Sequence, residues 1–155
     1  MLTPFKYLSP VIQKLMIINA VIFVIGFFLG PYEGIFTWAL SLTPSILTKV
    51  TPEFWFGKPW SIFTYMFVHG SFFHLFANMF FGLWMFGDSV ARDIGDKHFL
   101  KLYLLAGVFA GALSAVVYIV FQVPISGIVG ASGATYAIMY LFCRNNPQAT
   151  VYFMF

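Results

Sequence analysis

The feature that most constrains the fold of this chain is a series of four apolar stretches, at residues 11–29, 72–86, 100–123 and 132–143. Hydrophobic residues make up 61% of the 155 residues and charged residues only 8%, whereas about a quarter of the residues in a soluble domain are charged. So few charges cannot cover the surface of a water-soluble globule of this size. The sequence therefore predicts an all-α, polytopic transmembrane helical bundle.

The fourth stretch is too short to cross a bilayer as a helix. A helix from Ser132 to Arg144 is about 20 Å long at 1.5 Å per residue, and the hydrocarbon core is about 30 Å thick. The preceding residues 124–130 stay apolar but include a proline and two glycines, which form helix poorly. Non-helical backbone at membrane depth is tolerated only inside protein or beside a water-filled cavity. The sequence therefore predicts a cavity at the start of the fourth helix.

The basic residues indicate how the chain is oriented. Only Lys49 and Lys58 fall in residues 31–60, the longest connection, whose Trp, Phe, Pro and Gly residues predict a segment that rests in the membrane interface. The other six basic residues all fall on the opposite side: Lys6, Lys14, Arg92, Lys97, Lys101 and Arg144. Since cytoplasmic loops are rich in Lys and Arg, the sequence predicts a cell-membrane protein with a cytoplasmic N-terminus.

Several classes of protein are excluded or disfavoured. The net charge of +3 is scattered and does not indicate a nucleic-acid partner. The single cysteine, Cys143, cannot form an internal disulfide, and we interpret it as a helix-packing residue. The first stretch has Lys14 at its start and no small-residue cleavage site at its end, which indicates a retained span. Small residues in the third stretch, Gly107 and Gly111 among them, are typical of helix packing.

A first candidate for chemistry is the segment from Gly130 to Gly133, with Ser132 between the two glycines. Small residues in an apolar chain usually let helices approach closely, and that interpretation stays open. However, Ser132 falls at the predicted start of a helix inside the membrane, where free N–H groups favour negative charge. A serine nucleophile needs such donors to hold a tetrahedral oxyanion.

A second candidate is the set His69, His74 and Asn78. Polar residues at membrane depth are costly, so they indicate function. His74 and Asn78 are four residues apart and share one helix face, where both can point at one oxygen. The alternative is that they bond neighbouring helices. A zinc site is disfavoured because His69 and His74 are separated by about 140° around a helix and no Cys or acidic residue completes a ligand set.

Three segments together resemble the signature of the rhomboid family of intramembrane serine proteases: residues 59–70 (PWSIFTYMFVHG), 74–79 (HLFANM) and 130–136 (GASGATY). Gly95, in the turn after Arg92, also fits the family pattern. The resemblance covers nearly the whole chain, with the motifs in the family's order and spacing.

The resemblance implies a role for each matching residue. Ser132 would be the nucleophile, and His74, Asn78 and the backbone N–H of Ser132 would form the oxyanion hole. His69 would be a structural or hydrogen-bonding residue, and Tyr136 would stack against the catalytic histidine. Family members cleave membrane-spanning substrates in the bilayer with a Ser–His dyad, without metal or cofactor.

The chain departs from the family pattern at three points. Ser61 stands where the family usually has arginine, and Ala91 stands where a glutamate is common. The family's base is a histidine on a sixth span, but no histidine follows Ser132 and the sequence ends at Phe155, where a fifth span should begin. We therefore expect residues 1–155 to be a single rhomboid-like membrane domain truncated at its C-terminus.

Three functional hypotheses follow. The first is an intramembrane serine endopeptidase acting on single-span membrane proteins. The second is a catalytically inactive rhomboid-like binder of transmembrane helices, which the missing base favours. The third, a small channel or transporter, ranks last because the third stretch offers almost no polar residues to line a pathway.

Overall fold

The computed structural model describes residues 3–43, 58–121 and 127–150. In these ranges the chain is helical apart from connecting segments and one isolated antiparallel bridge between Leu42 and Ile128. The longer helices, in chain order, are α1 (Pro10–Phe28), α2 (Glu33–Leu40), α4 (Ser61–Thr64), α5 (Phe72–Ala77), η4 (Asn78–Gly87), α6 (Asp88–Ile94), α7 (Asp96–Val120) and α8 (Ser132–Asn145). Three single 3-10 turns accompany them: η1 (Phe5–Tyr7), η2 (Gly30–Tyr32) and η3 (Tyr65–Phe67). The predicted all-α class is confirmed.

Within the described ranges, two helices, α1 and α7, are long and apolar enough to cross a membrane. They correspond to the predicted stretches 11–29 and 100–123. A third candidate is the bent pair in which α4 and η3 meet α5, η4 and α6 at 92°. Its long arm begins at Phe72 as predicted but runs on to Ile94. The helix therefore extends beyond the predicted stretch 72–86 at its C-terminal end.

Helix α8 begins at Ser132, as the sequence predicts, and ends at Asn145. Its 14 residues span about 21 Å, which is shorter than the hydrocarbon core. Residues 127–130 are not helical. Two backbone contacts hold them: the N–H of Gly130 donates to the carbonyl of Tyr65 (2.9 Å), and Ile128 pairs with Leu42. The remainder of the predicted irregular segment, residues 124–126, lies outside the described residues.

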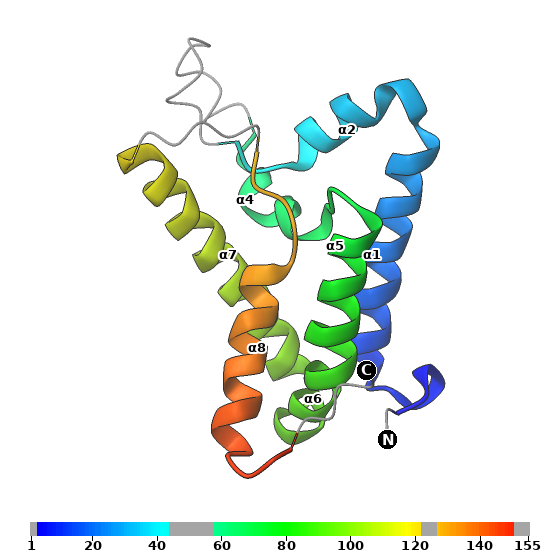
Figure 1. Cartoon of the computed structure of the whole chain (residues 1–155), viewed down its shortest axis with the longest axis vertical. Helices are drawn as coiled ribbons and strands as arrows, with labels where there is room; N and C mark the ends of the chain where they lie inside the picture. The colour runs from blue at the N-terminus through cyan, green and yellow to red at the C-terminus, as the bar shows by residue number, and fades with distance from the viewer. Residues whose placement is uncertain (1–2, 44–57, 122–126, 151–155) are drawn as a thin grey trace.

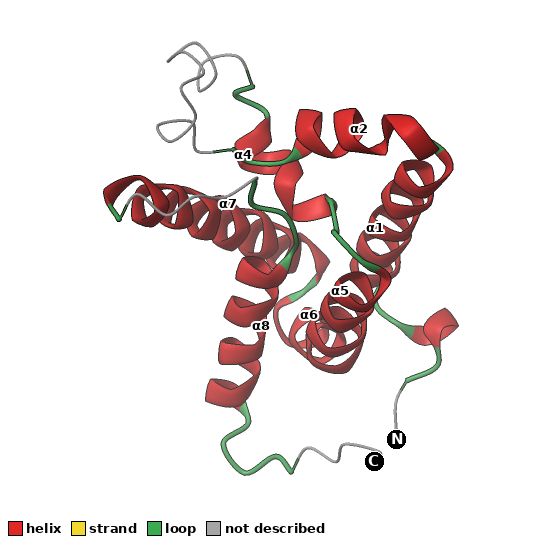
Figure 2. Cartoon of the chain, turned by 45° about the horizontal axis from the view of Figure 1, so that its top comes forward, coloured by secondary structure: helices red, strands yellow, loops and turns green. Residues whose placement is uncertain are grey.

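Glycines bring α7 and α8 close to their neighbours, and Figures 1 and 2 show α8 beside both α7 and η4. A Cβ at Gly107 would collide with Met66, and one at Gly111 would lie 2.6 Å from the ring of Tyr65. The predicted packing role of these two glycines is confirmed. A Cβ at Gly133 would collide with Ala110, so Gly133 also sets how closely α8 approaches α7.

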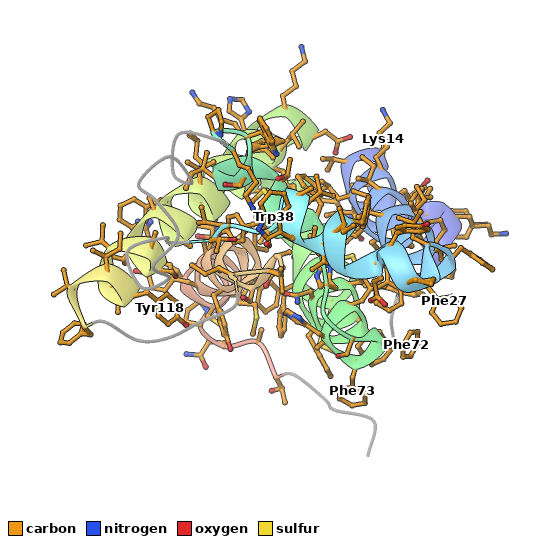
Figure 3. The ribbon with its side chains drawn as sticks, turned by 90° about the horizontal axis from the view of Figure 1, so that it is seen from above. Lys14, Phe27, Trp38, Phe72, Phe73 and Tyr118 are labelled. Carbon is orange, nitrogen blue, oxygen red and sulfur yellow. The ribbon has the colours of Figure 1, made fainter. Side chains whose placement is uncertain are left out.

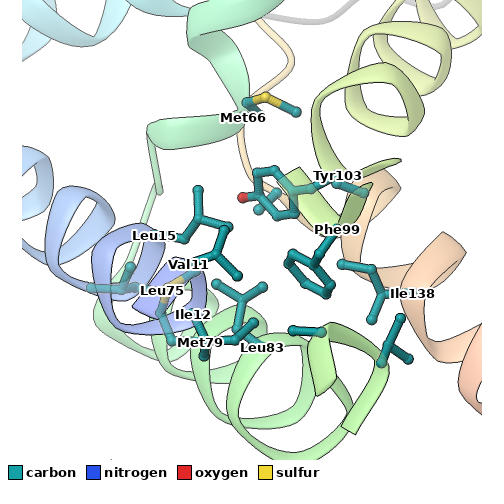
Figure 4. Packing of buried hydrophobic residues seen from close by; sticks show 14 of the residues in the cluster. Val11, Ile12, Leu15, Met66, Leu75, Met79, Leu83, Phe99, Tyr103 and Ile138 are labelled. Carbon is teal, nitrogen blue, oxygen red and sulfur yellow. The ribbon is translucent and has the colours of Figure 1, made fainter. Parts of the chain in front are cut away.

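The core lies where the main helices meet (Figure 4). Its largest fully buried side chains include Ile12, Met66, Leu83, Phe99, Tyr103 and Ile138. In contrast, large apolar side chains on the outside are exposed. Phe27, Phe72 and Phe73 point away from the bundle (Figure 3) and are 71%, 69% and 76% exposed. A surface of this kind is stable in lipid rather than water, which identifies a multi-pass membrane protein.

The two ends of the bundle differ in charge. The N-terminus, the turn between α6 and α7 and the end of α8 lie together at one end, and α2 lies at the other (Figure 1). The six basic residues assigned to one side therefore share one end, whereas Lys58 lies beside α2. Lys49 lies outside the described residues. Cys143 is exposed, so its interpretation as a packing residue is wrong: the side chain faces away from the helices described here.

Candidate active site

The first residue of α8 is Ser132, and no side chain of the described residues caps this helix. The first four N–H groups of a helix have no partner within the helix, so the start of α8 presents backbone donors around Ser132. The Ser132 side chain is half-buried, and its hydroxyl has no hydrogen-bond partner in the described part of the chain. This is the environment in which a serine oxygen is accessible beside donors for negative charge.

Gly130 shapes the approach to Ser132. Its φ of +107° is a conformation that residues with a side chain rarely adopt. A Cβ on Gly130 would lie 2.5 Å from both Cε1 and Nε2 of His74. The imidazole of His74 therefore packs directly on the Gly130 backbone, two residues before Ser132.

The two histidines of the bent span touch each other. Ser71 caps α5 by accepting a hydrogen bond from the N–H of His74 (3.1 Å), which fixes the first turn that carries His74. The His69 ring lies edge-on to the His74 ring, with the ring centroids 5.0 Å apart. In the described ranges no third His, Cys, Asp or Glu joins them, so the geometry offers a metal ion at most these two ligands.

Asn78 is buried one turn beyond His74. Its amide nitrogen donates to the carbonyl of His74 (3.0 Å), which leaves one of its two amide hydrogens uncommitted. The hydroxyl of Thr135 lies 3.3 Å from the amide oxygen of Asn78 and 3.1 Å from the carbonyl oxygen of Ser132. Thr135 thus links the two elements that carry the site.

Sequence reasoning missed Thr135. The available signal was a polar residue one turn beyond Ser132 in an apolar helix. Its contact partner was harder to find, because Thr135 packs in the space that a Cβ on Gly82 would fill. Gly82 and Gly87, the two glycines of η4, are five residues apart and do not form the four-residue spacing of a small-residue packing pattern.

These residues surround one cavity of about 380 Å³ between the bent span and α8. Its lining residues are His74, Ala77, Asn78, Phe81, Gly82, Phe86, Ser132, Thr135, Tyr136 and Met139. The structure therefore brings Ser132, His74, Asn78 and Tyr136 together. Tyr136 is 69% exposed and lies at the edge of the cavity.

The other candidate residues lie outside this lining. His69 lies behind His74, and Gly133 faces α7. The remaining histidine, His98, is on the first turns of α7 at the opposite end of the bundle, with its ring 3.1 Å from the carbonyl of Ile94. It is therefore no part of the cavity.

A family model, the Rhomboid domain, matches residues 57–155. RHOMBOID-like protein 12, mitochondrial, of Arabidopsis thaliana is 34% identical over 113 residues, covering 64% of this chain and 33% of that protein. The presenilin-associated rhomboid-like protein, mitochondrial, of Homo sapiens is 33% identical over 89 residues (57% of this chain, 23% of that protein). Rhomboid-like protease 1 of Toxoplasma gondii is 32% identical over 83 residues (54% and 27%).

The matched part of this chain spans about a third or less of each of these curated relatives. The family match, by contrast, covers more than half of this chain and includes every residue that lines the cavity. The chain belongs to the rhomboid family.

Proposed function

We propose that this chain is part of an intramembrane serine endopeptidase with Ser132 as its nucleophile, and that residues 1–155 form one rhomboid-like membrane domain. The observation that carries the proposal is the position of Ser132: it begins an uncapped helix and opens into the cavity that His74 and Asn78 also line. A serine elsewhere in an apolar helix would instead bond the preceding turn.

In the proposed reaction a base takes the proton of the Ser132 hydroxyl while its oxygen attacks the carbonyl carbon of a peptide bond. Negative charge develops on the carbonyl oxygen. The N–H of Ser132, the ring of His74 and the second amide hydrogen of Asn78 stabilise that oxyanion. Collapse of the tetrahedral intermediate breaks the C–N bond, the base gives its proton to the leaving amine, and water then hydrolyses the acyl-serine. No metal or cofactor takes part in this scheme.

The base in this proposal is a histidine outside these 155 residues, as the resemblance implies. None of the three histidines present acts as the base in this proposal. His98 lies at the far end of the bundle, His69 lies behind His74, and His74 stabilises the oxyanion. Tyr136, which lines the cavity one turn beyond Ser132, would stack against this base, as the resemblance implies.

The proposed substrates are single-span membrane proteins that reach the cavity from the bilayer. The sequence predicts the cell membrane as the location, whereas two of the relatives named above are mitochondrial. A fluorescent fusion of the protein, imaged in its own cells against markers of both membranes, distinguishes the two.

A fluorophosphonate probe tests the proposal, because it reacts only with an activated serine. We expect the full-length protein to be labelled and to cleave a single-span substrate, and we expect Ser132→Ala to abolish both. Ser114→Ala, a matched change on α7, is expected to alter neither. Asn78→Ala should slow cleavage by about 100-fold, the cost of one oxyanion donor. Cleavage that persists in Ser132→Ala would end the protease proposal.

The same probe addresses the alternative function, an inactive binder of transmembrane helices. That alternative predicts no Ser132-dependent labelling, together with retained binding of single-span proteins in a co-purification assay.

A further inference from the structure

A second cavity, of about 70 Å³, lies between α1, α2 and residues 68–71. It is at the end of the bundle where α2 crosses from α1 toward α4 (Figures 1 and 2). Apolar side chains of α1 form one wall, and four polar side chains contribute to the rest: Glu33, Thr37, His69 and Ser71. Glu33 is exposed, whereas His69 is buried.

The His69 ring has no hydrogen-bond partner for either nitrogen among the described residues, although the side chain is only 7% exposed. The backbone of Phe67 lies near the ring but not in hydrogen-bonding geometry. A buried polar atom without a hydrogen-bond partner destabilises the folded state, so a buried imidazole with two such nitrogens needs another partner.

Water is the partner that fits the cavity. One water needs about 10–15 Å³ of such space and two to four polar neighbours. The cavity has room for more than one, and the Glu33 carboxylate, the Thr37 hydroxyl and His69 itself provide the neighbours. A dry cavity is expected only where the walls are entirely apolar.

His69 also contacts a residue of the candidate active site. Its ring contacts the His74 ring, and His74 in turn packs on Gly130. We propose that the small cavity is a water site in which Glu33 and Thr37 hold ordered water against His69, and that His69 is thereby a positioning residue for His74. The water site stands by itself, whereas the importance of His74 rests on the proposed function.

Deuterium exchange at the ring carbon Cε1 of histidine, read by mass spectrometry, tests the water site without any catalysis. The protein has three histidines, and exposed His98 is the internal reference. Each rate is taken at the plateau of its pH profile. We expect His69 to exchange at a rate close to that of His98 despite its burial. Exchange at His69 that is slower by about tenfold or more, as for a group reached only by local unfolding, would overturn the proposal.

A substitution that fills the small cavity tests whether the water that reaches His69 lies there. A Cβ on Gly26 would lie 3.5 Å from Phe36, an ordinary contact, so Gly26→Leu reaches into the space without a collision at its base. We expect it to slow exchange at His69 while His98 is unchanged. Gly34→Leu, whose Cβ meets nothing within 4 Å, is the matched control and should change neither. If Gly26→Leu lowers the melting temperature sharply, Thr37→Leu replaces it as the filling variant.

The positioning role has its own measurement. The ¹⁵N shifts of the His74 ring report which nitrogen carries the proton. We expect Gly26→Leu to change the tautomer balance of His74 and Gly34→Leu to leave it unchanged. If deuterium exchange at His69 is slowed in the variant but the tautomer balance of His74 is unchanged, the positioning role is refuted. Fluorophosphonate labelling of Ser132 is measured separately, so a failure of the proposed function is distinguishable from a failure here.

Discussion

Gly130 meets two structural requirements at one position: a left-handed φ of +107° and direct contact with the His74 ring. Neither requirement is a chemical one, since glycine has no reactive group. Together they make Gly130 the residue that holds the segment before Ser132 against the histidine of the bent span.

Gly130→Ala is therefore expected to destabilise the protein by about 1–3 kcal/mol, the usual cost of a strained backbone, and to displace the His74 ring. Chemical unfolding in detergent measures the first effect, and loss of fluorophosphonate labelling measures the second. The matched control is Gly70→Ala, at a glycine whose Cβ would meet nothing within 4 Å. Equal stability of the two variants would contradict this prediction.

The sequence predicted some of these residues better than others, for a physical reason. The spacing of four placed His74 and Asn78 on one helix face, and the structure has both lining one cavity. The burial of His69 against α1 and α2, and the contact of Thr135 with Asn78, depend on how distant helices meet. No local pattern carries that information.

At the C-terminal end of α2, side chains from another segment hydrogen-bond the helix carbonyls. The carbonyls of its last three residues accept side-chain hydrogen bonds from the segment around α4: Trp60 donates to the carbonyl of Ala39 (2.9 Å) and Thr64 to that of Leu40 (2.8 Å). The ammonium of Lys58 bonds the carbonyls of Trp38 and Ser41 and lies over the Trp38 ring. Lys58 thus supplies a cation next to Ser61, where the family usually has arginine.

Lys58→Met, which keeps the length of the side chain, should destabilise the protein by about 1–3 kcal/mol because it removes the hydrogen bonds from the ammonium to the carbonyls of Trp38 and Ser41. The measurement is the midpoint of unfolding in detergent. Hydrogen exchange of the α2 amides should also rise. Lys14→Met on α1, where the lysine is exposed, provides the control, and a comparable loss there would refute the capping role of Lys58.

Burial also makes the contribution of Lys58 depend on pH. It lowers the pKa of Lys58 below its usual 10.5, so between the two pKa values the unfolded chain binds more protons than the folded one. The free energy of unfolding should then rise as the pH increases from the lowered pKa toward 10.5 and fall again on acidification. The free energy of unfolding is measured against pH for the protein and for Lys58→Met, and the difference between the two isolates the contribution of Lys58. A difference that stays constant or falls as the pH increases over this range would contradict the prediction.

The opposite end of the bundle has a second interhelical contact, centred on buried Asp88. Its carboxylate accepts from the backbone N–H and hydroxyl of Ser9 (2.7 and 2.9 Å) and from Arg92 (3.0 Å). Arg92 also donates to the carbonyl of Tyr7 (2.5 Å). The entry to α1 is thereby joined to α6, beside Ala91, where the family commonly has glutamate.

Asp88→Ala is expected to cost about 1–3 kcal/mol, because hydrogen bonds to a charged group are lost and the Ser9 N–H is left buried. Thermal unfolding measures the loss. Asp93→Ala, at an exposed aspartate of the same helix, should change the midpoint little. Equal midpoints of thermal unfolding for the two variants would show that the Asp88 contacts do not stabilise the protein.

The elements themselves were largely predictable, since apolar length and glycine or proline breaks are local properties. The start of α8 at Ser132 and the bounds of α1 followed from them. The continuation of the bent span to Ile94 did not, because Asp88 and Arg92 read as loop residues until their contacts with Ser9 and Tyr7 are seen. Cys143 was misread since an apolar helix alone does not tell which face is packed.

At the scale of the whole molecule, the bundle exposes many large apolar side chains, and its two ends differ in charge. The N-terminus, the turn between α6 and α7 and the end of α8, which are rich in Lys and Arg, lie at one end, and α2 lies at the other (Figure 1), with Lys58 bonded to its C-terminal end. Because cytoplasmic segments are rich in Lys and Arg, the first end is predicted to face the cytoplasm in a cell membrane, or the equivalent compartment in an organelle.

The single cysteine tests this orientation directly. Cys143 is exposed and adjacent to Arg144 at the basic end, so a membrane-impermeant maleimide should label it in inside-out vesicles and not in right-side-out ones. Gly34→Cys in a Cys143→Ser background places a thiol on α2 at the other end, in open space, and should show the reverse pattern. Labelling of both thiols from the same side would mean that the two ends do not lie on opposite faces of the membrane. Reversed labelling of both would keep the bundle and invert its orientation, and would then place α2 and the His69 cavity that it lines on the cytoplasmic side.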